Sequence, residues 1–290
     1  MLALAGPACS EGPREAPIKV LIVDGHNNHN WRATTPLLKS ELERTGRFAV
    51  DVSSNLKPGD KPGTAPSVPF PPDLGKYDVL VSNYNGAPWP KEFQQQLEAR
   101  LKEGKIGLVI VHAANNSFPG WGEYNAMIGM GWRDNRFGDR LVVDDRGQEK
   151  RVPKGEGPGA GHGPQHAFKV TVRDPDHPVT KGMPREWLHA QDELYQGMRG
   201  PARHVHLLAT AYSDRKYRGT GEHEPMIWTV EYGKGRVFHT PMGHDLPALR
   251  CLGFVATLQR GTEWAATGRV TLPLPEGFPT AEKTSSLPAR

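Results

Sequence analysis

The sequence is poor in cysteine and in long apolar segments. Only Cys9 and Cys251 occur among the 290 residues, and neither their number nor their spacing indicates a zinc site or a disulfide framework. No run of about 18 apolar residues is present, so no membrane span is expected. The 36 Lys and Arg residues are scattered, whereas a nucleic-acid surface needs a basic stripe. We therefore expect no nucleic acid as partner; a small acidic or neutral substrate is compatible with this charge, but the charge does not argue for it.

The two ends of the chain lack the periodicity of folded elements. Residues 1–17 are expected to form an N-terminal tail, 18–268 one α/β domain, and 269–290 a C-terminal tail. The opening MLALAGPACS has two interpretations: an irregular extension, or the remnant of an export signal that a late start codon has shortened. The location accordingly stays open between the periplasm or exterior and the cytoplasm.

What the sequence has in abundance is glycine and proline, with 33 and 27 residues. Well-formed apolar runs separate them, so they predict long ordered loops rather than disorder. In the first part of the chain, strands are predicted over 18–23, 48–54, 77–84 and 106–113, and helices over 34–46 and 88–104. Strands that alternate with helices predict an α/β fold with a doubly wound, mostly parallel sheet and long loop insertions.

The second part of the chain is less regular. Residues 114–165 carry little pattern, and 177–195 are expected to form a loop with a short helix. Strands are predicted over 166–174, 204–213, 225–233 and 235–243, with a Gly-Lys-Gly hairpin joining the last two, and a closing helix over 246–266.

Polar side chains follow several of the predicted strands. Ligands of open parallel sheets bind beyond the carboxyl ends of the strands, near a switch in strand order. The residues in these positions are His26, His29 and Trp31 after the first strand, Asn83 after the third, His112 and Asn115 after the fourth, and His244 after the last. If the strands are parallel, these side chains share one crevice.

His112 follows the apolar run LVIV, where related α/β hydrolytic folds make a nucleophile turn. No Ser or Cys stands there, so acyl transfer through either nucleophile is not expected. From the sequence alone, a purely structural role for His112 at the strand end stays open.

The remaining candidates lie on irregular segments. His162 and His166 have a metal-pair spacing for a helix, but the glycine and proline between them exclude a helix. Asp192 and Glu193 are adjacent and point to different sides; one of them is a candidate metal ligand or base, with a cap or salt bridge as the alternative. His189 is expected at the surface.

Two tryptophans lie on a glycine-rich loop. Trp121 and Trp132 there suit stacking against the C–H face of a sugar, or they fasten the loop to the body of the domain. Trp187, Trp228 and Trp264 are expected in the core.

Several motifs occur in a fixed order: KVLIVDGHNNHNW, GLVIVHAANNSFPGWGEYNAMIG, HAFKVTVRDPDHPVTKGMP, DELY and YGKGRVFHTPMGH. Together they resemble the ThuA-like, or trehalose-utilisation, family over roughly residues 18–266. The resemblance implies a flavodoxin-like sheet of the class I glutamine amidotransferase-like superfamily. It also implies that the catalytic cysteine of the amidotransferases is missing, as it is from this chain.

The resemblance also implies site residues. The family positions carried over are His29, His112, His166, Glu193 and His244; His26 and His162 match less closely, and Trp31 and Trp121 match family aromatics. We expect catalysis from His112, Glu193 and His244 and metal binding from His29, His162 and His166. Substrate binding is expected from His26, Trp31, Asn83, Asn115, Trp121 and Trp132.

For function, the resemblance implies carbohydrate metabolism in bacteria, with trehalose and related disaccharides oxidised at C3 as substrates. A hydrolase or lyase that acts on 3-keto-sugars is the leading interpretation, with a divalent metal ion as the candidate cofactor and no nucleotide cofactor. Two alternatives remain: a non-catalytic sugar-binding protein, and a metal-dependent amide or ester hydrolase. A homo-oligomer is compatible with the sequence.

Overall fold

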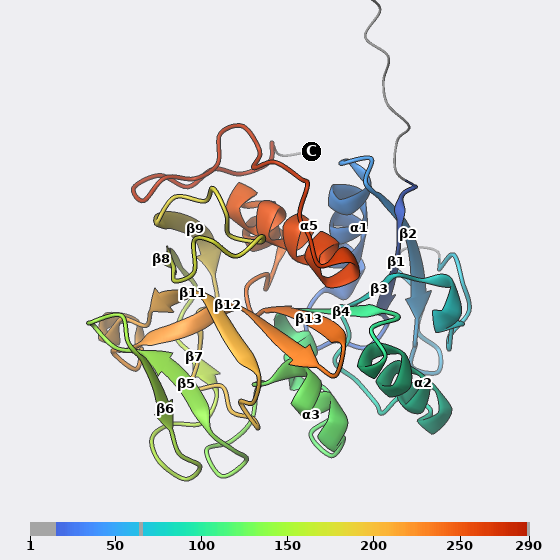
Figure 1. Ribbon diagram of the computed structural model, residues 1–290, viewed down its shortest axis with the longest axis horizontal. Coiled ribbons are helices and arrows are strands. Elements are labelled where there is room, and N and C mark those ends of the chain that lie inside the picture. The colour runs from blue at the N-terminus through green and yellow to red at the C-terminus, as the bar shows by residue number, and fades with distance from the viewer. Residues whose placement is uncertain (1–15, 64–65, 289–290) are drawn as a thin grey trace, which may run out of the picture.

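The structure, a computed structural model, describes residues 16–63 and 66–288 and is built around one large mixed sheet (Figure 1). One half of this 11-stranded sheet is parallel and carries helices on both faces; the other half is antiparallel. Cys9 lies outside the described residues.

The parallel half has the strand order β2-β1-β3-β4-β13. Its strands are β1 (Ile18–Asp24), β2 (Phe48–Ser54), β3 (Val79–Ser82), β4 (Gly107–Val111) and β13 (Gly235–Thr240). This is the flavodoxin-like order, in which the chain changes direction across the sheet between β1 and β3. The predicted doubly wound α/β fold with a flavodoxin-like parallel half is confirmed.

The antiparallel half is larger than the sequence analysis expects. It continues through β12 (His223–Tyr232), β11 (Val205–Tyr212), β8 (His166–Val172) and β9 (Glu186–Asp192), with the hairpin of β5 (Arg140–Val143) and β6 (Glu149–Val152) attached to β12. A separate ladder pairs β7 (Gly161–His162) with β10 (Tyr195–Gln196). The prediction of a loop and short helix over 177–195 holds for the loop over 177–185 and is wrong for 186–192, because β9 pairs with β8 there.

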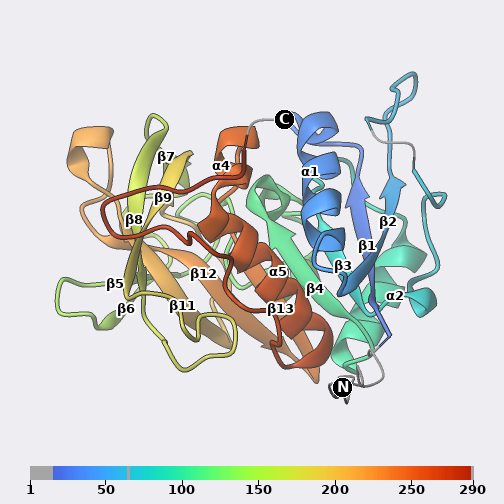
Figure 2. The same cartoon turned by 90° about the horizontal axis from the view of Figure 1, so that it is seen from above.

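Helices cover both faces of the parallel half. On one face lie α1 (Trp31–Glu43) and α5 (Leu252–Thr267), side by side in Figure 2; α2 (Lys91–Lys102) and α3 (Gly122–Ile128) lie on the other. Three short 3-10 helices are η1 (Leu74–Lys76), η2 (His112–Asn116) and η3 (Arg215–Tyr217). The predicted helix over 246–266 is divided into α4 (Leu246–Arg250) and α5, because Cys251 is extended and forms a β-bridge with Ser286.

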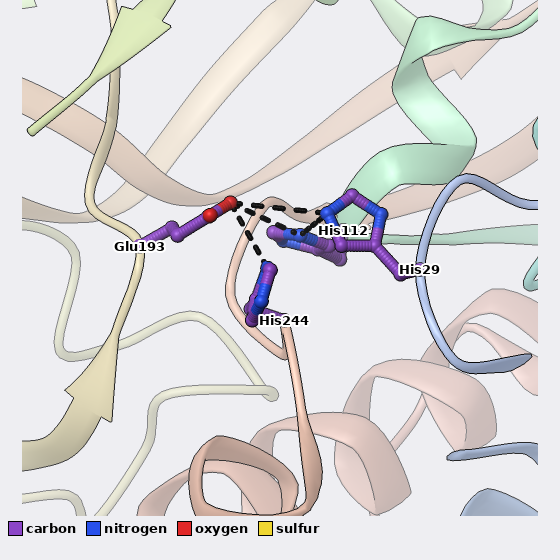
Figure 3. A group of neighbouring side chains, drawn as sticks. All are labelled: His29, His112, Glu193 and His244. Atoms are coloured by element: carbon purple, nitrogen blue, oxygen red, sulfur yellow. Dashed lines mark hydrogen bonds and ion pairs between the residues drawn. The ribbon is translucent and has the colours of Figure 1, made fainter. Parts of the chain in front are cut away.

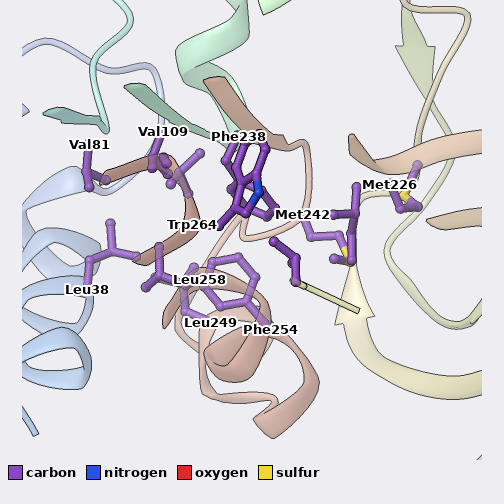
Figure 4. Close-up of a cluster of buried hydrophobic side chains, with 14 of the residues drawn as sticks. Leu38, Val81, Val109, Met226, Phe238, Met242, Leu249, Phe254, Leu258 and Trp264 are labelled. Carbon is purple, nitrogen blue, oxygen red and sulfur yellow. The ribbon is translucent and has the colours of Figure 1, made fainter. Parts of the chain in front are cut away.

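Alternation along the parallel strands creates two hydrophobic layers. In β1, Val20 and Ile22 face the α1–α5 side, whereas Leu21 and Val23 face the α2 side. Figure 4 shows the first layer, where Leu38 and Leu258, among other side chains, pack beneath the sheet. Each fully buried aliphatic side chain contributes about 1.5–3 kcal/mol. The core positions predicted for Trp187, Trp228 and Trp264 are confirmed.

The segment expected as a C-terminal tail follows the surface of the domain. The amide of Leu188 in β9 donates to the carbonyl of Thr280 at 2.7 Å, and Phe278 packs against the core. This contact covers part of an edge strand, which otherwise offers unpaired backbone groups to other chains. Within residues 16–63 and 66–288, no helix is both long and apolar enough to cross a membrane.

Candidate metal centre

Four side chains from separate segments meet at one edge of the sheet (Figure 3). His29 comes from the loop after β1, His112 directly follows β4, and His244 lies in the loop after β13. These three segments leave the carboxyl ends of parallel strands, where ligands bind in such sheets. Glu193 reaches the same place from the end of the antiparallel strand β9.

The four side chains have the composition and spacing of a transition-metal site. One ligand atom from each lies within 4.8 Å of all the others. Glu193 Oε2 is 3.0 Å from His244 Nδ1, 3.7 Å from His112 Nε2 and 3.9 Å from His29 Nε2. A tetrahedral zinc ion with bonds of about 2.1 Å needs ligand atoms roughly 3.4 Å apart. Three imidazoles and one carboxylate therefore fit a zinc-type ion.

Two of the imidazoles are held in a defined tautomer. His112 Nδ1 donates to the carbonyl of Pro241 at 2.7 Å, and His29 Nδ1 donates to Asn27 Oδ1 at 3.2 Å. Each Nε2 atom is then an unprotonated acceptor, and the two acceptors face each other at 3.4 Å. Hydrogen bonds of this type orient the histidine ligands of metal sites. Two lone pairs directed at the same point favour a cation between them.

The backbone at His112 is strained. Its φ angle is +47°, in the left-handed region that non-glycine residues rarely adopt. The sharp turn after β4 turns the imidazole from the buried strand toward the loops of His29 and His244. Strain of this kind costs about 1–3 kcal/mol and is found mainly at functional sites.

The electrostatics of the group favour the neutral forms of His29 and His112 and the ionised form of Glu193. Burial and the neighbouring histidines lower the pKa of His29 to about 4, and burial lowers the pKa of His112. A hydrogen bond to Glu193 raises the pKa of His244. Burial opposes ionisation of Glu193, but its hydrogen bond to His244 and the nearby imidazoles lower its pKa. Of the three imidazoles, His244 is therefore the one whose protonation most opposes a metal ion.

A buried carboxylate supports two of the four residues from behind. Asp192 Oδ2 accepts hydrogen bonds from His189 Nε2 at 2.8 Å and from the amide of Gly243 at 2.7 Å. Its Oδ1 accepts from the amides of Glu193 at 2.7 Å and His244 at 3.1 Å. The two adjacent acids therefore point to different sides, as predicted. The expectation that His189 lies at the surface is wrong, because its ring is fully buried against Asp192.

Tyr195, which is not among the residues predicted from the sequence, reaches the centre with its hydroxyl. This oxygen lies 3.1 Å from His112 Nε2, and the side chain is buried. The aromatic rings of Trp132 and Tyr195 are 4.6 Å apart. A usable signal was the spacing in DELY: Tyr195 is two residues after Glu193, and residues at this spacing in extended chain point to the same side.

Of the three histidines expected to bind metal, only His29 belongs to the group of four. His162 is exposed, and its Nε2 lies 3.5 Å from Glu193 Oε1, so it borders the centre. The ring of His166 instead stacks on Tyr217 at 3.8 Å, and its Nδ1 bonds to a neighbouring carbonyl. The expected catalytic residues, His112, Glu193 and His244, are all in the group.

The two loop tryptophans lie in different surroundings. Trp132 is half-buried beside His162 and lines a surface cleft of about 410 Å³ together with Asp134 and Asn135. Trp121 is buried among aromatic rings, including that of Trp89. The structure therefore brings Trp132 to the edge of the centre and leaves Trp121 in the core.

The other residues expected to bind substrate make contacts within the protein. Asn83 is buried, and its carbonyl and Oδ1 accept hydrogen bonds from the Asn27 amide that orients His29. Asn115 Nδ2 lies 3.2 Å from His239 Nε2. These asparagines therefore form hydrogen bonds within the protein, next to the edge of the sheet that carries the group of four.

Two candidates near the end of β1, His26 and Trp31, lie away from the metal centre. His26 stacks on Tyr84, and its Nδ1 accepts a hydrogen bond from the amide of Ala87 at 3.2 Å. Trp31 is buried as the first residue of α1. Within this loop, only His29 reaches the group of four.

Comparisons with known proteins agree with the motifs. Residues 19–265 match the family model described as ThuA, trehalose utilisation. A ThuA-like protein from Parabacteroides merdae is 41% identical in sequence and has a TM-score of 0.86. The match covers 94% of this chain and 98% of the Parabacteroides chain. A ThuA-like protein from Bacteroides uniformis is 17% identical, with a TM-score of 0.58 over 91% and 97%, and shares the fold. No curated protein matches the sequence. With the family model matching most of its length, the chain belongs to the ThuA trehalose-utilisation family.

Proposed function

We propose that this protein is a metal-dependent enzyme that cleaves or processes 3-keto-sugars derived from disaccharides. The observation that carries the proposal is the meeting of three histidines and one glutamate beside Tyr195 and Trp132. A divalent cation at this position would act as a Lewis acid toward a sugar oxygen. The half-buried ring of Trp132 offers an apolar face beside it, as sugar rings require.

The acids near the centre argue against an ordinary glycosidase mechanism. That mechanism needs two opposed carboxyl groups, one on each side of the scissile bond. Asp192, the acid next to Glu193, is fully buried and already accepts four hydrogen bonds. Asp245 accepts from the amide of Ala248 at the start of α4. Glu193 is therefore the acid that faces the cluster of histidines.

A ketone at C3 offers a different route. It makes the proton on C2 acidic, so a single base can start the reaction. His112 cannot serve readily, because both of its nitrogens have hydrogen-bond partners. Glu193 is the better candidate, because its Oε2 faces the three imidazoles whereas its Oε1 lies on the side of His162, 3.5 Å from Nε2.

The bond changes then balance without an oxidant. The C2–H electrons form a C1=C2 double bond as the C1–O bond breaks, and the departing oxygen takes up a proton. Water adds later across the double bond, so the sum is hydrolysis; without this addition, the reaction is that of a lyase. Hydrogen-bond donors stabilise the negative charge that develops on the C3 oxygen.

Incubation with 3-keto-trehalose in D₂O tests the proposal. We expect release of glucose, deuterium at C2 of recovered sugar, loss of both with a chelator, and recovery on adding Zn²⁺ or Co²⁺. Glu193→Gln should abolish sugar release and deuterium uptake, whereas Glu186→Gln should abolish neither, because Glu186 is a half-buried acid of β9 that pairs with Lys169 of β8. Failure to release sugar with or without chelator would refute the proposal.

The same geometry supports a second candidate, a metal-dependent amide or ester hydrolase. Catalytic zinc sites use three protein ligands and leave a position for water. The three histidines supply such a set, with Glu193 beside them as a base. Metal-dependent hydrolysis of p-nitrophenyl acetate without turnover of keto-sugar would favour this candidate. Binding of the sugar without any turnover would favour the non-catalytic alternative.

A further inference from the structure

Tyr195 is placed as a fixed hydroxyl donor at the edge of the candidate metal centre. It belongs to β10, which pairs with β7 so that Tyr195 lies opposite His162. Its ring packs at 4.6 Å against both Trp132 and His112. The hydroxyl therefore has little freedom to leave this position, and it is buried together with the ring.

The contact of His112 with Pro241 determines the direction of the hydrogen bond between Tyr195 and His112. Pro241 contributes a carbonyl oxygen, which can only accept, so the proton of the neutral His112 imidazole is on Nδ1. His112 Nε2 then carries a lone pair, and the Tyr195 hydroxyl 3.1 Å away donates to it. The same lone pair faces His29 Nε2 and Glu193. One lone pair cannot bind a cation and accept a hydrogen bond at once.

We propose that the Tyr195 hydroxyl competes with the cation for the lone pair of His112 Nε2. Once a cation holds this lone pair, the hydroxyl donates its hydrogen bond to the C3 oxygen of the sugar instead. The inference rests on the cation site of the proposed function and adds a substrate-contacting residue to it. A buried hydroxyl that loses its acceptor needs another. A carbonyl or enolate oxygen at the centre supplies one, because Tyr195 stands beside the same atom that would hold the cation.

The proposal predicts effects of opposite sign for Tyr195→Phe. Removal of the competing hydrogen bond should tighten Zn²⁺ or Co²⁺ binding by about two- to tenfold, as expected for one net hydrogen bond. Turnover of the keto-sugar should fall about 10²-fold, the usual effect of losing one donor to a developing oxyanion. A merely structural role would weaken both, and a role as metal ligand would weaken cation binding.

Calorimetric titration with Co²⁺ of the parent, Tyr195→Phe and Tyr217→Phe tests this. Tyr217 stacks on His166, outside the group of four, and its variant should match the parent. Equal or weaker binding by Tyr195→Phe, at a parental melting temperature, overturns the inference and leaves the metal site standing. Tighter binding with unchanged turnover overturns the donor role. If the parent binds no cation, the proposed function fails and the inference fails with it.

Discussion

The carboxylate of Glu193 is the most direct test of the metal centre. The substitution Glu193→Gln keeps the shape of the side chain and removes its charge. In the structure its Oε2 lies 3.0–3.9 Å from the nitrogens of His244, His112 and His29, so the charge lies at the centre of the group. We expect the variant to bind a divalent cation far more weakly than the parent.

The magnitude follows from the distances. Two unit charges about 4 Å apart interact by roughly 4 kcal/mol at an effective dielectric constant near 20. The attraction to a divalent ion is larger, but desolvation and displacement of the His244 proton offset part of it. A net loss of about 3–4 kcal/mol corresponds to affinity lower by roughly 10²–10³-fold.

The assay is calorimetric titration with Zn²⁺ or Co²⁺, accompanied by thermal unfolding without metal. The lost pair with His244 is partly exposed and should cost about 1 kcal/mol, or a melting temperature lower by about 2–4 °C. The matched variant Glu186→Gln should keep the parental affinity, because its partner is Lys169 on the neighbouring strand. Parental affinity in a folded Glu193→Gln protein would show that this carboxylate is not a ligand.

Three further predictions concern protonation and packing. Because the pKa of His244 is raised by its bond to Glu193, cation affinity should rise about tenfold per pH unit until His244 loses its proton, as titrations across pH can show. Asp192→Asn should lower the free energy of unfolding by about 3–5 kcal/mol, since it leaves buried His189 without its counter-charge. Despite burial, the bond to Asp192 raises the pKa of His189 from 6.5 to about 9. The stabilisation by this pair is therefore full below pH 6.5 and is lost as the pH rises through about 9. In urea unfolding, the free energy of unfolding of the parent should decline over this pH range, and that of Asp192→Asn should not. Gly253→Ala would place a Cβ 2.3 Å from the Trp187 ring and should cost about 1–3 kcal/mol in thermal unfolding.

The parallel half of the fold is readable from the sequence because its signals are local. The run IKVLIV predicts a strand buried on both faces, and β1 lies inside that half, between β2 and β3. The strand over 186–192 was missed although Trp187 and His189 alternate with more exposed residues. The break before α5 depends on the bridge between Cys251 and Ser286, a contact that no local pattern contains.

The residues of the candidate site can be predicted from the sequence where they directly follow a parallel strand. His29, His112 and His244 follow parallel strands, so the rule that ligands bind at carboxyl ends finds all three. His166 was selected by its position in a motif, yet β8 starts there and carries its ring toward Tyr217. Glu193 stayed ambiguous because it follows an antiparallel strand, outside the reach of that rule.

The turn at His112 connects the scaffold to its chemistry. His112 directly follows β4, and its left-handed backbone costs about 1–3 kcal/mol. The residue held there is an imidazole whose Nδ1 is bound to Pro241, which leaves Nε2 to face His29 and Glu193. The strained turn thus exposes a candidate ligand atom at the carboxyl edge of the sheet, and a cost of this size argues for a functional rather than a purely structural role of His112.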